Sequence, residues 1–169
     1  DFVCKLSKLY FNNNYYIFGG SAEKVNILKK NYQNFNLTIN SYKPYSQLEK
    51  IISKMDVLLI PSDKKLIKAT GGVGNLTKFT SPLKLFDYLA SGKLIISTNL
   101  NVMREIIKNN LNCIMINNLS LLKWYKQINS ISKNINHINV IKKNAYNLSK
   151  KYTYYKRAES ILSNINKNK

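Results

Sequence analysis

The sequence predicts an α/β domain built on a Rossmann-like, doubly wound parallel sheet with C-terminal helices, and two features support this fold class. Short apolar runs rich in β-branched and aromatic residues recur along the chain, and segments with helical periodicity separate them. The runs are apolar at successive positions, which is typical of parallel strands covered by helices on both faces. We expect strands at residues 15–18, 37–39, 57–60, 94–96 and 113–116.

The segments between these runs predict crossover helices with recognisable ends. Ser21 and Ser46 suit the first position of their helices. The clearest helix follows Ser81 as N-cap, has Pro82 in its first turn, where a missing N–H costs nothing, and stops at Gly92 in a left-handed conformation. Helices are therefore expected at residues 21–32, 45–54, 82–91 and 101–109, with several more after residue 118.

Composition indicates one domain with a real hydrophobic core. The chain has 169 residues, 44% of them hydrophobic, and no apolar run long enough to span a membrane. It opens on Asp1 in what reads as the middle of a helix, so we expect a piece of a longer protein. Cys4 and Cys113 have neither the number nor the spacing of a disulfide framework or a metal site. Two buried thiols in a reducing compartment are expected, and the predicted location is the cytoplasm or the inner face of the plasma membrane.

The formal charge of +19 has two interpretations. Lysines occur in every segment together with many Asn, Ile and Tyr residues, as an AT-rich coding sequence would give without any binding surface. Alternatively, the charge attracts anionic lipid headgroups. Specific nucleic-acid recognition has little support, because the sequence contains no helix-turn-helix, zinc-finger or aromatic RNA-binding motif.

Ligands of doubly wound sheets bind outside the carboxyl ends of the strands, which directs attention to four loops. Gly19 and Gly20 end the first run and let backbone approach a ligand, although the G-x-G-x-x-G fingerprint is missing. The loop with glycines at 71, 72 and 74 is long for a connection from strand to helix, which favours a functional role. The four loops are 19–20, 41–44, 61–80 and 97–99.

A polar seam on the helix after Ser81 is the second indication of a ligand site. Leu83, Leu85, Phe86, Leu89 and Ala90 are expected on the buried face of this helix. The polar residues on its other face are Lys84, Asp87 and Ser91, at spacings of three and four. A phosphate could bind at the helix N-terminus, where Ser81 and Lys84 would hold it. The Asp87 carboxylate, one turn further along the helix, could then accept hydrogen bonds from sugar hydroxyls. An ordinary ion pair on a solvated face is the alternative.

The sequence lacks the residue patterns that metal-dependent, covalent or ATP-dependent catalysis needs. No two acids are close enough in sequence to hold a divalent cation, so no metal and no cofactor are expected. His137, the single histidine, lies in the C-terminal helical region away from the loops that matter. The sequence has no nucleophile elbow and no Walker loop. These features predict a domain that binds a ligand rather than one that supplies a catalytic base.

Several stretches together resemble the C-terminal domain of GT-B glycosyltransferases of family 4, the glycosyl transferases group 1 type. The most specific of them is SPLKLFDYLASGK at 81–93. The others are DVLLIPS at 56–62, REII at 104–107 and YTYYKRA at 152–158, the last of which is similar to the final helix of that family.

The resemblance implies a nucleotide-sugar donor domain at 1–150 and, at 151–169, a helix that packs toward an absent N-terminal acceptor domain. The implied function is the donor half of a retaining, metal-independent bacterial glycosyltransferase that makes polysaccharide or glycolipid from a nucleoside-diphosphate sugar. The fragment is expected to be inactive alone. Phe79 stands where many members carry a first acid, and Asp87 stands at the position of the second.

The resemblance also implies a role for each candidate donor-binding residue. Gly19 and Gly20 would face the diphosphate, and Tyr42 and Lys43 would flank the base. The donor sugar would meet the glycine loop, and Asp87 would accept from the ribose. The remaining candidates are Gly72 and Gly74 for the sugar and Ser81 and Lys84 for the phosphate.

Three other interpretations of the whole chain stay open at the level of sequence. The first is a GT-B-like domain that binds nucleotide or nothing and has a structural or regulatory role. The second is a basic module that binds a membrane surface or nucleic acid. The third is an epimerase on the same scaffold.

Overall fold

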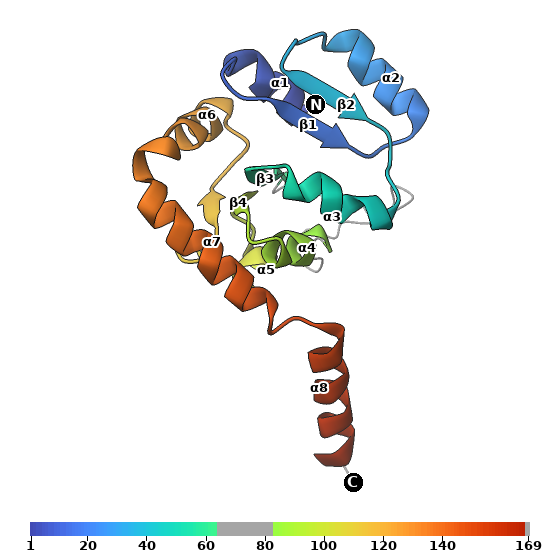
Figure 1. Ribbon diagram of the computed structural model, residues 1–169, viewed down its shortest axis with the longest axis vertical. Helices are drawn as coiled ribbons and strands as arrows, with labels where there is room; N and C mark the ends of the chain where they lie inside the picture. The colour runs from blue at the N-terminus through green and yellow to red at the C-terminus, as the bar shows by residue number, and fades with distance from the viewer. Residues whose placement is uncertain (64–82, 168–169) are drawn as a thin grey trace.

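The computed structural model describes residues 1–63 and 83–167, and these form an α/β domain with a protruding C-terminal helix (Figure 1). Strands and helices alternate along the chain as the sequence predicts. The elements are α1 (Phe2–Leu9), β1 (Tyr15–Phe18), α2 (Ala22–Asn31), β2 (Leu37–Asn40), α3 (Tyr45–Ser53), β3 (Val57–Ile60), α4 (Lys84–Ala90), β4 (Leu94–Thr98), α5 (Asn101–Arg104), β5 (Ile114–Ile116), α6 (Leu121–Asn129), the 3₁₀ helix η1 (Ser132–Asn134), α7 (Ile135–Ser149) and α8 (Tyr154–Lys167).

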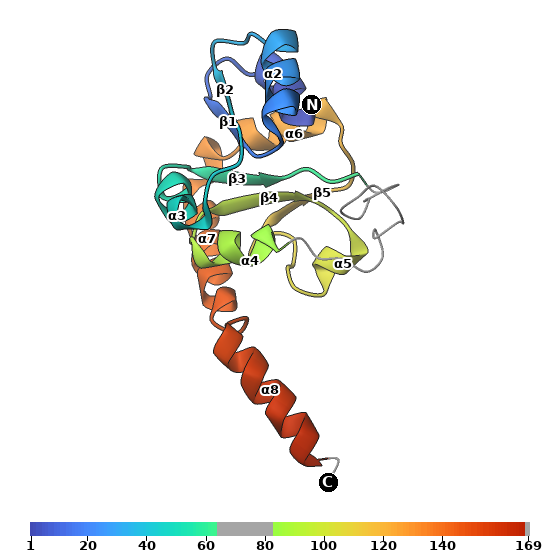
Figure 2. The same cartoon turned by 90° about the vertical axis from the view of Figure 1, so that its right-hand side faces the viewer.

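All the strand pairs in the described residues are parallel, which confirms the predicted sheet class. Their hydrogen bonds form two pieces, β1-β2 and β3-β4-β5, rather than one continuous ladder. Figure 2 shows β3, β4 and β5 side by side, with β1 and β2 on one side of them. Side chains join the two pieces, because Tyr15 of β1 packs in one cluster with Leu94 and Ile96 of β4.

Burial of the strands on both faces holds for β4 alone among the five strands. All five residues of β4 are buried, and it lies between two neighbours with α7 packed against it. The other strands keep partly exposed positions, and Tyr16 of β1 is 44% exposed. The expectation drawn from their apolar runs is wrong for these strands, because an edge position leaves part of a strand uncovered whatever its composition.

Local sequence signals predicted two of three helix ends correctly. Ser21 caps α2 through its hydroxyl, which accepts from the Lys24 N–H at 3.4 Å, as predicted. Ser46 is not the N-cap of its helix, because α3 already begins at Tyr45 after Pro44. Gly92 has a φ of +64°, which confirms the left-handed stop after α4.

Helix α5 is shorter than the predicted 101–109, because asparagines close a turn beyond it. The Asn112 side chain accepts from the Lys108 N–H at 2.8 Å. Asn110 adopts a φ of +58°, and its N–H donates to the Cys113 carbonyl at 2.9 Å. Asparagine bonds to nearby backbone in this way more readily than it extends a helix.

Only part of the predicted buried face of α4 is buried. Leu85 and Leu89 are fully buried, whereas Phe86 is partly covered and Ala90 is exposed. Leu83 is 83% exposed just before the helix, so its place in the buried face is a wrong prediction. The two buried leucines belong to a core cluster completed by Ile60, Ile95, Leu100, Val102, Met103, Ile107, Cys113 and Ala145.

The two thiols are buried and free, as the sequence indicates. Cys4 lies in a small cluster with Val25 and Ile39 beneath the β1-β2 sheet. Cys113 lies in the cluster around α4, and burial raises the pKa of its thiol to about 12. Both positions show that the cysteines contribute apolar packing.

Helix α8 extends away from the rest of the chain in both views (Figures 1 and 2). Its described side chains, from Tyr154 to Ile165, are all exposed. A helix is therefore present within the predicted 151–169 segment, and its partner stays a prediction. None of the described helices has the length and apolar character of a membrane span.

Candidate donor-binding site

Asp87 lies in the first turn of α4 and accepts a hydrogen bond from the Tyr45 hydroxyl at 3.0 Å. Tyr45 is the first residue of α3, so this bond joins the helix after β2 to the helix before β4. The hydrogen bond and then the negative charge of Asp87 raise the pKa of Tyr45 above its ordinary value. The carboxylate is partly exposed and retains room to accept further hydrogen bonds.

The ion pair that was the alternative for this seam is absent from the part of the chain that the structure describes. The ion pairs found there join Lys5 to Asp1 and Lys156 to Glu159, not Lys84 to Asp87. Lys84 is exposed as a residue, yet desolvation of its ammonium lowers its pKa. Lys84 and Asp87 therefore do not form an ion pair with each other.

Gly19 and Gly20 end β1 in conformations that suit glycine. Their φ angles are +133° and +88°, and the Gly19 N–H donates to the Asn40 carbonyl at 3.0 Å. A Cβ placed on Gly19 would meet no atom within 4 Å. The backbone beside this residue is thus open, which fits the close approach that the sequence predicts for a ligand.

Tyr42 and Lys43 lie between β2 and α3. Tyr42 is 73% exposed, and Lys43 is partly buried. Among the described residues, no hydrogen bond links either of them or the glycine pair to Asp87. The structure instead brings Tyr45, three residues after Tyr42, to the carboxylate. Sequence reasoning missed Tyr45; its position at the start of the helix after the 41–44 loop is the signal that could have found it.

Three of the predicted donor-binding residues, Gly72, Gly74 and Ser81, lie outside the described residues, as do Phe79 and Pro82. Their assignment stays a prediction. The part of the site that the structure describes consists of the glycine pair, the 42–43 segment and the α4 seam.

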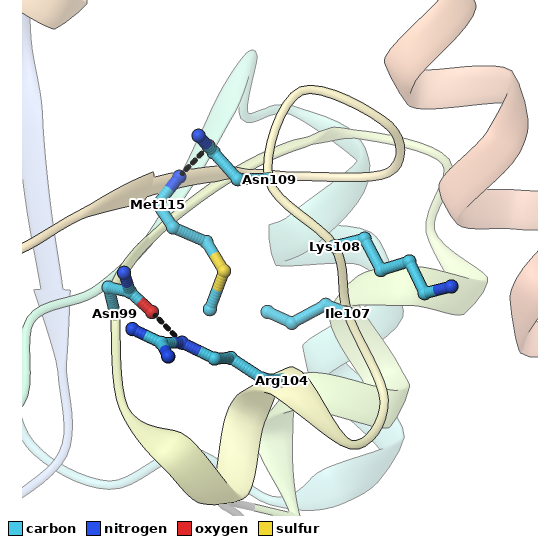
Figure 3. A pocket seen from close by; sticks show the side chains of 6 residues that line it. All are labelled: Asn99, Arg104, Ile107, Lys108, Asn109 and Met115. Atoms are coloured by element: carbon cyan, nitrogen blue, oxygen red, sulfur yellow. Dashed lines mark hydrogen bonds between the residues drawn. The ribbon is translucent and has the colours of Figure 1, made fainter.

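A polar pocket at the carboxyl end of β4 was not predicted in detail, although the sequence pointed to the 97–99 loop. The Arg104 Nε–H donates to the Asn99 side-chain oxygen at 2.7 Å, and the Asn99 amide donates to Asn117 at 2.8 Å. In Figure 3, Asn99 and Arg104 meet beside Met115, and the Lys108 side chain points away from them. The pocket measures about 250 Å³. Its guanidinium and amide groups suit an anionic or polar group.

A second hollow adjoins it, since Met115 lines both. It measures about 460 Å³ and is bounded by the end of β5 and one face of α6, which contributes Lys123 and Lys126. No acid lines either hollow among the described residues, so the charged side chains that line them are all cationic.

The sequence predicts neither a metal site nor a catalytic base, and both expectations stay predictions. No group of three or more potential ligands from His, Cys, Asp and Glu is found in residues 1–63 and 83–167. His137 is exposed in the first turn of α7.

The fold is the Rossmann-like α/β fold found in GT-B glycosyltransferases. No protein-family model and no curated protein matches the sequence. The chain is similar in structure to Anabaena HepE in complex with UDP and glucose, with a TM-score of 0.72 over 96% of this chain and 44% of that one, at 9% identity. It therefore spans less than half of that protein.

Two further structures show the same fold. One is the C-terminal domain of LpcC, a glycosyl transferase group 1 family protein from Francisella tularensis, with a TM-score of 0.62, 16% identity, and coverage of 92% of this chain and 76% of that one. The other is the pneumococcal O-GlcNAc transferase GtfA in complex with UDP and GlcNAc, with a TM-score of 0.68, 14% identity, and coverage of 98% and 31%.

Proposed function

We propose that this chain is the donor-binding, C-terminal half of a family 4 glycosyltransferase that takes a sugar from a nucleoside-diphosphate sugar. The structural neighbours that hold UDP together with glucose or GlcNAc support a nucleotide-sugar donor. The chain spans 44% of HepE and 31% of GtfA, so the acceptor would be bound by a further, N-terminal domain.

The observation that carries the proposal is the state of Asp87. The alternative ion pair with the lysine three residues before it is not formed in the described residues, so the carboxylate is not held by that charge. Tyr45 donates to one carboxylate oxygen, which orients the group and leaves acceptor capacity for two neighbouring hydroxyls. Ribose supplies such a pair of hydroxyls.

Lys84 is suited to a phosphate in the same ligand. It precedes the carboxylate by one turn of α4 and has no ionic partner within the described ranges. Desolvation lowers its pKa, so a bound diphosphate would restore the stability of the charged ammonium. Gly19 and Gly20 offer open backbone to the same group.

The transfer itself would be retaining and metal-independent. The departing diphosphate gains negative charge as the bond to the sugar breaks, and Lys84 with other cations would stabilise that charge electrostatically. Acceptors in polysaccharide or glycolipid synthesis are proposed, with transfer requiring the complete two-domain protein.

Calorimetric titration of the chain with UDP, GDP and ADP tests donor binding. One nucleotide should bind, and Asp87→Asn should weaken it about 10- to 100-fold, the range expected when a hydrogen bond to a charged group is lost. Tyr45→Phe should weaken it less, because it only frees the carboxylate to rotate. Asp56→Asn, the same change at an exposed position before the amino end of β3, is the matched control.

Two results would contradict the proposal. One is an Asp87→Asn protein that is folded by circular dichroism and binds nucleotide as tightly as the unaltered chain. The other is a chain that binds none of the three nucleotides. Binding without sugar transfer by the complete protein would instead support a non-catalytic nucleotide-binding domain.

A further inference from the structure

Two phenylalanines lie exposed and stacked at the edge where β1 and β2 begin. Phe11 is 62% exposed and Phe35 is 82% exposed, and their rings are nearly parallel with centroids 6.0 Å apart. Phe11 follows α1 and Phe35 follows α2, each in the loop that leads into a strand. Leu9 beside them is 48% exposed. Exposed aromatics that gather from separate loops mark contact surfaces more often than isolated ones do.

Two asparagines, the buried Asn36 and the partly buried Asn34, hold both loops in place. The Asn36 side-chain amide lies 3.1, 2.8 and 3.0 Å from the carbonyl oxygens of Ser7, Tyr10 and Asn13, so it ties the second loop to the first. Asn34 adds a bond to the Ser7 hydroxyl at 2.7 Å. Asn36 is 3% exposed. The aromatic pair therefore stands on a fixed support, and its exposure is built into the fold.

Lysines lie in the last turns of the two helices that lead into these loops. Lys8 is in the last turn of α1, and Lys29 and Lys30 are in the last turn of α2; all three are exposed. Lys8 lies over the Tyr32 ring at 5.2 Å, which fixes one positive charge between the two loops. Of the two acids before residue 49, Asp1 is paired with Lys5, and Glu23 lies in the first turn of α2, at the opposite end of that helix from its last-turn lysines. We call the surface of Leu9, Phe11 and Phe35 with these three lysines the aromatic-lysine edge.

This edge is separate from the proposed donor site. It lies at the amino ends of β1 and β2, whereas Gly19 and Gly20 lie at the carboxyl end of β1. It is also separate from α8 (Figure 1). Variants of this edge can therefore be tested independently of nucleotide binding.

We propose that the aromatic-lysine edge binds the surface of an anionic lipid bilayer. The two rings would enter the boundary between headgroups and acyl chains, and the lysines would contact the anionic headgroups above it. Phenylalanine flanked by lysine has the amphipathic chemistry that this boundary favours. A second copy of the chain fits less well, because each copy carries a net charge of +19 and the lysines of the two edges would repel.

Vesicle flotation tests the proposal. The chain should float with vesicles of phosphatidylcholine and phosphatidylglycerol, and not with phosphatidylcholine alone. Phe11→Ser with Phe35→Ser should weaken binding about tenfold or more, because the apolar contact is lost. Lys29→Gln with Lys30→Gln should weaken it about 30-fold, and added salt should weaken the unaltered protein.

Matched controls separate this edge from general charge and from α8. Lys150→Gln with Lys151→Gln removes the same charge from two exposed lysines at the far end of α7 and should change binding about twofold or less. Tyr154→Ser with Tyr155→Ser removes exposed rings from α8 and should leave binding unchanged. Circular dichroism of each variant confirms that it is folded.

A direct reading of insertion comes from Phe11→Trp. Its emission should shift to the blue with anionic vesicles and be quenched by brominated lipid, whereas the buried Trp124 should change little. Four results would overturn the proposal: equal loss with the Lys150 and Lys151 control, loss with the α8 variant alone, no quenching of Trp at residue 11, or a dimer abolished by the Phe11 and Phe35 changes without vesicle binding.

Discussion

The β3–β5 and β1–β2 pieces of the sheet contain similar apolar runs, but their strands are buried to different extents. In the first piece, β4 is buried at all five positions, between two neighbouring strands. In the second, two strands pair only with each other, and most of their residues remain partly exposed. The larger piece holds the main core, whereas the smaller one places open glycines at its carboxyl end and an aromatic pair at its amino end.

The difference shows that similar composition does not fix burial. A central strand is covered because neighbours and helices occupy both of its edges and both of its faces. An edge strand retains free surface, which makes it available for ligands. In this protein, both proposed contact regions include parts of the smaller piece.

The largest expected effect tests this contrast in the core. Ile96→Ala in β4 should lower the free energy of unfolding by about 4 kcal/mol, because Ile96 is fully buried between strands that cannot close the cavity. Ile39→Ala in β2 should cost about 2 kcal/mol, because a two-stranded edge relaxes more easily. Urea denaturation measures both. Equal losses would show that the two pieces are equally well packed.

An alkaline titration tests burial in the larger piece. Burial raises the pKa of Cys113 from 9.0 to about 12, so the unfolded state loses this proton first as the pH rises. The stabilisation linked to this thiol is complete below pH 9 and is lost between pH 9 and 12, at about 1.4 kcal/mol per pH unit. The unfolding free energies of the unaltered chain and of Cys113→Ala should therefore converge over that range. Parallel curves would contradict the assigned burial.

The smallest effect concerns the support of the smaller piece. Asn36→Ala should cost about 2 kcal/mol in urea denaturation, because three carbonyls lose the amide that links the two loops. The exposed Asn12→Ala, in the first loop, should cost little. If Asn36→Ala were as mild as Asn12→Ala, the loops would not depend on that amide.

Sequence reasoning located the secondary structure well because its signals are local. Apolar runs gave β1 and β3 with their observed limits, and Ser21 and Gly92 marked helix ends through their own hydrogen bonding and backbone freedom. It was wrong at two places. Leu83 is apolar yet exposed, and α5 stops early because asparagines form a turn.

In the candidate site too, local spacing identified some residues and missed others. Lys84 and Asp87 could be selected from their spacing along a helix, and the structure confirms that they share α4. Spacing along one helix does not point to Tyr45, because 42 residues separate it from the carboxylate it contacts. Arg104 and Asn99 were near a loop that the sequence indicated, but their hydrogen bond depends on how the chain turns after β4.

The sequence by itself determined the alternation of parallel strands and helices, the stop at Gly92 and the polar seam of α4, since each follows from side chains within a turn or a strand. The tertiary structure alone decided that the sheet's hydrogen bonds form two pieces, that Tyr45 rather than Lys84 meets Asp87, and that Phe11 and Phe35 stack in the open. These outcomes depend on contacts between residues far apart in the chain, which local preference does not specify.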